Sequence, residues 1–186
     1  MSKIIILSPS SSGKTYFMNK NNFLFNGKKL VCNEFLSSHN NTYGDFRMGS
    51  TAALVPSGHE YYKSWDDIYK IGVKLFLNSD KYNDSVLIYN SSYHIKYLKE
   101  NYPDVDLRVV LINEEKHREK FLDKWESIND TKKSLIDLIK SDSNLLRING
   151  LASMWFLMEE RKIYKRLTDK YNISIYDSFE KALNKK

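Results

Sequence analysis

The residues best suited to chemistry lie in one run, Ser8-Pro9-Ser10-Ser11-Ser12-Gly13-Lys14-Thr15. This is the spacing of a phosphate-binding loop, although Ser8 stands where the pattern begins with glycine. In such a loop the backbone N–H groups surround the phosphates, the Lys14 ammonium reaches the β and γ oxygens, and the Thr15 hydroxyl binds Mg²⁺. The sequence therefore predicts a site for ATP with Mg²⁺, made by a turn without glycine at its first position.

The flanking residues have the order that this loop requires. A buried parallel strand is predicted at Ile4–Leu7, because all four residues are apolar and three are β-branched, and a helix is expected to open at Tyr16-Phe17-Met18. Strand, loop and helix in this order argue against the alternative, a chance Gly-Lys-Thr in a polar turn. Further strands are expected at 29–32, 85–89, 107–112 and 172–176.

Helical patterns alternate with these strands. One helix is expected to begin at Ser64, whose hydroxyl can cap it, and the last helix is expected to be capped by Ser178. The helices between and after the strands are expected at 93–101, 114–124, 132–140, 151–168 and 179–183. This alternation predicts an α/β fold with a doubly wound, five-stranded parallel sheet in a single domain over residues 1–186.

Composition limits the class of protein. A net charge of +6 and a pI of about 9.1 fit a phosphate-rich partner, either a nucleotide or a nucleic acid, although the abundance of Lys, Asn, Ile and Tyr is also what an AT-rich coding sequence would give. No membrane span, export signal or ligand-spaced histidine cluster is evident, and Cys32 is the only cysteine. We therefore expect a cytoplasmic protein with no disulfide, no structural metal and no membrane partner.

Three stretches resemble the guanylate kinase family of nucleoside monophosphate kinases. They are the Pro-Ser loop at 8–15, the segment Gly58-His59-Glu60-Tyr61-Tyr62-Lys63-Ser64-Trp65, and the strand–helix–strand unit 86–112 with Tyr102-Pro103-Asp104 before its last strand. The resemblance implies a P-loop kinase type of fold. It also implies an acceptor-binding insertion at about 35–80 and a helical lid region at about 114–150.

The acceptor region departs from the family pattern. The resemblance implies Arg47 and Tyr61, with Glu60 beside them, as the counterparts of the residues that hold the monophosphate. A family hairpin is missing before Ser85, so the acceptor subdomain is expected to be reduced. Asn78 stands where the family reads the base with Glu, and Asn90 stands where the family has an acid at the end of the third strand.

Cations for phosphoryl transfer are expected in the lid. Arg118, Lys120 and Lys124 are spaced over one to two helical turns, and Arg147 lies beside Gly150, a candidate hinge. The alternative for the first three is a solvated basic face paired with neighbouring glutamates, and for Arg147 a side chain that covers its apolar neighbours. Glu34, after the second strand, is a candidate general base, with an exposed loop glutamate as the alternative.

These features predict an ATP-dependent kinase that transfers the γ-phosphoryl group to a nucleotide-type acceptor, as a guanylate kinase-like nucleoside monophosphate kinase would. Two alternatives stay open. One is a nucleic-acid kinase that acts on a DNA or RNA hydroxyl or on a hydroxymethylated base, which would use Glu34 and the positive charge. The other is a non-catalytic guanylate kinase-like binding module, which the departures in the acceptor region favour and the intact Gly13-Lys14-Thr15 disfavours.

Overall fold

The computed structural model describes residues 3–33, 59–131 and 143–184. Within these ranges it describes the backbone throughout, and the side chains except at 59–68, 122, 124–131, 143–154 and 156. Glu34, Arg47 and the helix expected at 132–140 lie outside the described residues. In the part of the chain that is described, no helix has both the length and the apolar character needed to cross a membrane.

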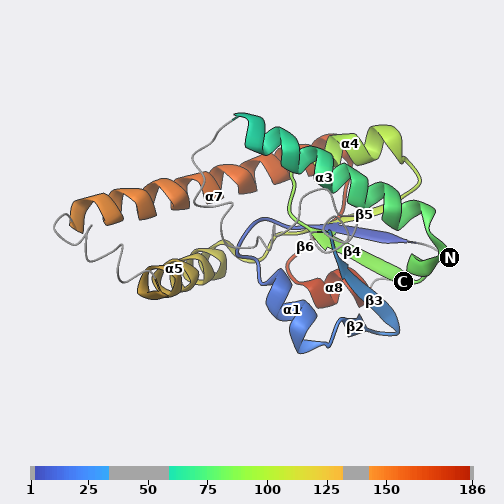
Figure 1. The fold of residues 1–186 in the computed structure, drawn as a ribbon, viewed down its shortest axis with the longest axis horizontal. Helices are drawn as coiled ribbons and strands as arrows, with labels where there is room; N and C mark the ends of the chain where they lie inside the picture. The colour runs from blue at the N-terminus through green and yellow to red at the C-terminus, as the bar shows by residue number, and fades with distance from the viewer. Residues whose placement is uncertain (1–2, 34–58, 132–142, 185–186) are drawn as a thin grey trace.

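A six-stranded sheet forms the centre of the molecule (Figure 1). Its strands lie in the order β2-β3-β4-β1-β5-β6. The bounds are Ile4–Leu7 for β1, Leu24–Phe25 for β2, Lys28–Cys32 for β3, Ser85–Tyr89 for β4, Asp106–Val110 for β5 and Ile175–Tyr176 for β6. Five strands are parallel, and β1 lies between β4 and β5 with Ile4 opposite Val86 and Asp106. The parallel pairing is as predicted from the sequence.

The predicted strand count was wrong by one. The short strand β2 pairs antiparallel with β3, Leu24 opposite Lys29, across a two-residue turn at Asn26 and Gly27. Both turn residues have positive φ, 49° and 76°, as Asn-Gly hairpin turns require. Two residues are too few to show an alternating apolar pattern, so the sequence analysis missed this edge strand.

Helices cover both faces of the sheet (Figure 1). The bounds are Lys14–Lys20 for α1, His59–Asn78 for α3, His94–Asn101 for α4, Glu114–Thr131 for α5, Ser143–Tyr171 for α7 and Phe179–Asn184 for α8. One core cluster joins Ile5 and Leu7 of β1 to α3, α4 and α7, and the other joins Ile4 and Ile6 to α1 and α8. Successive side chains of β1 therefore point to opposite faces of the sheet and pack in two apolar layers, as in a doubly wound α/β fold.

Several helices are longer than the sequence predicted. Helix α3 already includes His59, so the start expected at Ser64 was wrong, and α5 and α7 extend beyond 114–124 and 151–168. Gly150 lies inside the continuous helix α7 instead of at a break. The cap predicted for the last helix is confirmed, because the Lys181 N–H donates to Ser178 Oγ at 3.1 Å. Helices α5 and α7 run side by side away from the sheet (Figure 1).

Candidate functional site

The segment that joins β1 to α1, Ser8–Gly13, is called the β1–α1 loop. It begins at the carboxyl end of a central parallel strand, where ligand sites of α/β sheets form. Ser8 is buried: its N–H donates to the Tyr89 carbonyl at 3.1 Å and its hydroxyl to the Val110 carbonyl at 2.8 Å. Positive φ falls instead on Ser11, at 58°, and on Gly13, at 85°. The first position of the loop therefore needs no glycine, and its serine fastens the loop to both neighbouring strands.

The Lys14 ammonium lies against the β1–α1 loop. Its Nζ donates to the carbonyl oxygens of Ser8, at 3.1 Å, and Pro9, at 2.6 Å, and the Ser12 hydroxyl donates to the same Pro9 carbonyl at 2.6 Å. Helix α1 then begins with the bond from the Phe17 N–H to the Gly13 carbonyl at 2.9 Å. A cation and the loop backbone are thus held together within one short segment, with the Thr15 side chain exposed beside them.

A second cation reaches this loop from α5. A methyl group built on Gly13 would lie 3.0 Å from Lys120 Nζ, and the same ammonium lies 6.0 Å from the centre of the Tyr16 ring. Lys120 therefore occupies the space directly over Gly13. Of the cations that the sequence analysis grouped in the lid, Lys120 is the one that the described side chains bring to the β1–α1 loop.

Asn90, at the end of β4, connects the loop to α7. Its amide nitrogen donates to the Ser10 hydroxyl at 3.2 Å, and its amide oxygen accepts from the Tyr164 hydroxyl at 2.9 Å. Burial raises the pKa of Tyr164 well above its usual value, so this phenol stays protonated and able to donate. The Tyr164 oxygen in turn accepts from the Ser91 N–H at 3.1 Å. Asn90 is therefore held at both ends of its amide.

Glu160 of α7 places a carboxylate at the same loop. The carboxylate faces the Asn90 side chain, the Ser10 backbone N–H and the charge of Lys14, and each of the three favours its charged form. Burial raises the pKa of the Glu160 carboxyl, because removing water penalises the charged form more than these three groups favour it. A proton-accepting group thus lies beside the cation of the predicted phosphate site.

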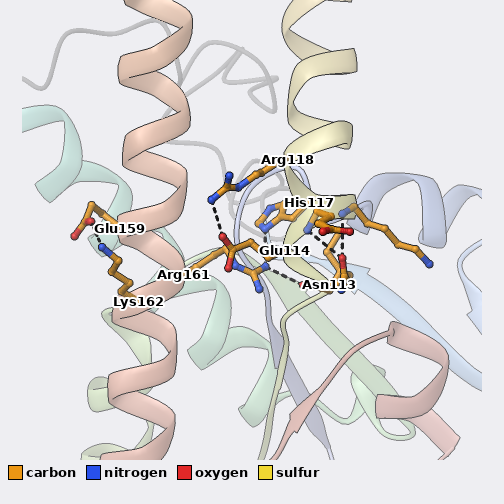
Figure 2. A network of polar contacts seen from close by, with 10 residues as sticks. Asn113, Glu114, His117, Arg118, Glu159, Arg161 and Lys162 are labelled. Carbon is orange, nitrogen blue, oxygen red and sulfur yellow. Dashed lines mark hydrogen bonds and ion pairs between the residues drawn. The ribbon is translucent and has the colours of Figure 1, made fainter.

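A buried imidazole, that of His117, links α5 and α7 to the loop (Figure 2). His117 Nε2 lies 2.6 Å from the Ser10 carbonyl oxygen, and His117 Nδ1 lies 2.8 Å from Arg161 Nη1. The same Nη1 donates to the Ile112 carbonyl at 2.9 Å. His117 is fully buried and Arg161 is only 6% exposed. Burial lowers the pKa of His117, the contact with the Ser10 carbonyl opposes this, and the charges of Arg161, Lys14 and Lys120 lower the pKa further.

Arg118 and Asn78 are not brought to the β1–α1 loop. Arg118 Nη2 lies 2.7 Å from Glu114 Oε1 in an exposed pair one helical turn apart (Figure 2). For Arg118, this is the solvated basic face paired with a glutamate that was the alternative to a lid cation. Asn78 lies at the end of α3. Lys3 Nζ donates to the carbonyls of Phe76 and Leu77 and so holds this end of the helix. Lys3 precedes β1, so Asn78 lies at the amino edge of the sheet, opposite the edge that carries the loop.

The remaining predicted residues fall where the structure does not describe a side chain. Glu34 and Arg47 lie outside the described residues. Glu60 and Tyr61 are placed by their backbone in the first turn of α3. Lys124 and Arg147 are likewise placed only by their backbone, in α5 and in the first two turns of α7.

Four functional candidates escaped the sequence analysis: His117, Glu160, Arg161 and Tyr164. A signal for two of them exists. The buried residues of α7 recur at Leu157, Arg161, Tyr164 and Thr168, which is the spacing of one helical face. An arginine in the middle of such an apolar stripe marks a buried charge that needs partners, and this marks it as more than a surface residue.

No protein-family model matches the chain, and no curated protein is significantly similar to it.

Proposed function

We propose that this protein is an ATP-dependent P-loop kinase that transfers the γ-phosphoryl group to a nucleotide-type acceptor. One observation carries the proposal. Two lysines from distant segments, Lys14 and Lys120, converge on a loop that joins a central parallel strand to a helix. Phosphoryl transfer depends chiefly on positioned positive charge around the moving phosphoryl group, and this convergence supplies it.

The residues at the loop fit Mg²⁺·ATP, which supplies the transferable phosphoryl group. Lys14 and Lys120 would neutralise phosphate oxygens, and the exposed Thr15 hydroxyl would take part in holding the metal. Asn90 and Glu160, at the edge of the same loop, supply an amide and a carboxylate near the reacting groups. The chain thus provides cations, a hydroxyl and a proton acceptor without any residue from outside the described ranges.

A nucleoside monophosphate is the acceptor that the resemblance to guanylate kinases favours. Arg47, Glu60 and Tyr61 would hold it. Glu60 and Tyr61 lie in the first turn of α3, which packs on the same face of the sheet as α4 and α7. Lys124 and Arg147 belong to the two helices that would close over the triphosphate, and Glu34 follows β3, the strand next to β4.

The decisive variant is Lys14→Ala. We expect it to lower kcat/KM for phosphoryl transfer from ATP by at least about 10²-fold, because a fixed cation on the transferring oxygens is lost. Lys20→Ala, at the exposed far end of the same helix, is the matched control and should keep wild-type turnover. Full activity in Lys14→Ala would refute the assignment.

The acceptor is identified by screening labelled ATP against the nucleoside monophosphates, single-stranded DNA, duplex DNA and base-modified DNA. A nucleic-acid kinase would be recognised by binding that weakens steeply with salt, since counterions are released when phosphates are neutralised. A non-catalytic module would show no heat on titration with ATP and Mg²⁺ and no transfer to any acceptor.

A further inference from the structure

Ser10 connects the β1–α1 loop to three other elements of the structure. Its N–H faces the Glu160 carboxylate, its carbonyl oxygen contacts His117 Nε2, and its hydroxyl accepts from Asn90. The three partners come from α7, α5 and the end of β4. The carbonyl contact bears directly on the peptide that follows Ser10, so the orientation of this peptide is held by a group outside the loop.

This peptide is the one that most needs support. The Ser10 carbonyl shares its plane with the N–H of Ser11, and Ser11 has φ of 58°, the left-handed conformation that disfavours residues other than glycine by about 1 kcal/mol. A loop that pays this cost keeps its shape only if its surroundings hold it. The contact from His117 to the Ser10 carbonyl is the contact that opposes rotation of this plane.

The partner on the other side of the imidazole fixes its protonation state. A guanidinium can only donate hydrogen bonds, so His117 Nδ1 must be the acceptor of the bond from Arg161. The single proton of the neutral ring is then on Nε2, where it is donated to the Ser10 carbonyl. Protonation of Nδ1 would set an N–H against the Arg161 N–H at 2.8 Å and break this arrangement.

We propose that His117 is a positioning residue of the β1–α1 loop: held by Arg161 as the neutral tautomer with the proton on Nε2, it fixes the Ser10–Ser11 peptide in the orientation that binds a nucleotide's phosphates. This inference rests on the proposed function only for the identity of the bound molecule, a nucleotide. The Ser10 carbonyl favours protonation of the ring, but the charges that act on it are cationic: Arg161 from α7, Lys14 from α1 and Lys120 from α5 itself. All three oppose protonation of the ring.

The wild-type chain tests the tautomer directly. In a ¹⁵N-labelled sample, two-dimensional NMR of the histidine side chains distinguishes a proton on Nε2 from a proton on Nδ1, and a pH titration gives the pKa of His117. We expect the Nε2–H form at pH 7 and titration below the usual range of histidine. An imidazolium or an Nδ1–H ring at pH 7 would overturn the proposal.

Two amide variants separate the two ring nitrogens. In His117→Gln the side-chain N–H₂ can take the place of Nε2 and donate to Ser10, whereas in His117→Asn the amide reaches only the place of Nδ1. We expect His117→Asn to weaken binding of Mg²⁺·ADP, measured by calorimetry, by about tenfold, and His117→Gln by less than about threefold. As pH is lowered through the His117 pKa, the wild-type affinity should fall more steeply than the affinity of His117→Gln.

The outcomes also separate this proposal from the proposed function. Equal affinities of wild type and His117→Asn, or an unchanged acid dependence in His117→Gln, would show that His117 does not position the loop. If wild type binds no Mg²⁺·ADP, the kinase assignment fails, and hydrogen exchange of the Ser11 amide then decides the positioning role. That exchange should be faster in His117→Asn than in His117→Gln, and equal rates would overturn the role.

Discussion

The two faces of α5 show how differently one helix can use its charged and polar residues. On the inner face, His117 is fully buried against Ser10 and Lys120 lies over Gly13. On the outer face, Arg118 and Glu114 form an ion pair in which both side chains are about half exposed. The adjacent residues His117 and Arg118 therefore differ in burial, since the first is buried and the second is exposed. The residue with the weaker charge makes the contact with the candidate site.

The difference follows from hydration. An exposed ion pair contributes about 0 to 1 kcal/mol to stability, because water screens it and both side chains lose freedom. Removal of a buried polar side chain instead leaves its hydrogen-bond partners unsatisfied, which costs about 1 to 3 kcal/mol for each partner. Contacts on the inner face should therefore dominate both stability and activity, and matched substitutions on the two faces test this.

The largest effect is expected for Arg161→Met. It leaves the Ile112 carbonyl and His117 Nδ1 without their donor, so the free energy of unfolding should fall by about 2 to 4 kcal/mol. Arg166→Met, on the exposed side of the same helix, should change it by less than about 0.5 kcal/mol. Urea denaturation followed by circular dichroism measures both. Equal losses in the two variants would remove the distinction between buried and exposed faces.

Activity should separate Lys120 from Arg118. Lys120→Met removes a cation from the space over Gly13 and is expected to lower kcat by about tenfold, with a smaller change in the affinity for ATP. Arg118→Met removes only the exposed partner of Glu114, so its kcat should change by less than about twofold. Steady-state kinetics at saturating ATP and acceptor decides. A larger loss in Arg118→Met would restore Arg118 as the lid cation and leave Lys120 as a surface residue.

The pH dependence of stability should carry two opposite contributions from this site. The pKa of His117 is lowered by folding, so the stability that depends on it is complete above the usual pKa of histidine and is lost as pH falls toward the lowered value. The pKa of Glu160 is raised, so its contribution falls as pH rises from the usual glutamate value through the raised one. Glu160→Gln should therefore be more stable than wild type at pH 7, and His117→Gln should lose less stability in acid. Urea titrations from pH 4 to 8 would show the reverse ordering if these shifts have the wrong sign.

The smallest effects are expected within the β1–α1 loop. Ser11→Gly relieves the strain of a left-handed serine but adds freedom to the unfolded chain, so the net gain in stability should be below about 0.5 kcal/mol. Gly13→Ala is the contrasting change, since it combines φ of 85° with a methyl group 3.0 Å from Lys120 Nζ, and it should destabilise by about 1 to 2 kcal/mol. Thermal denaturation compares them. A stabilising Gly13→Ala would contradict both the left-handed backbone of Gly13 and the position of Lys120 over it.

Much of the fold follows from local sequence. The apolar runs at Ile4–Leu7 and Ser85–Tyr89 identify buried strands because both faces of a parallel sheet are covered, and Ser178 caps α8 because its hydroxyl satisfies a free N–H of the first turn. The position of Lys14 beside its loop is also local, because its ammonium bonds to the carbonyls of Ser8 and Pro9 in the same short segment. The strand β2 and the helix ends were less predictable, because short elements and frayed termini depend on what packs beside them.

The rest of the site was decided by tertiary structure. Nothing in the sequence near His117 or Glu160 indicates that Ser10 is their common partner, because the contacts join α5, α7 and the β1–α1 loop across large separations in the chain. Which face of a charged helix turns inward depends on the neighbouring helix and the sheet, and a shift of one residue, from 117 to 118, reverses burial and solvent exposure. Residue types and spacing thus determined the loop and its lysine. Packing determined which polar groups lose their water and must bond to that loop instead.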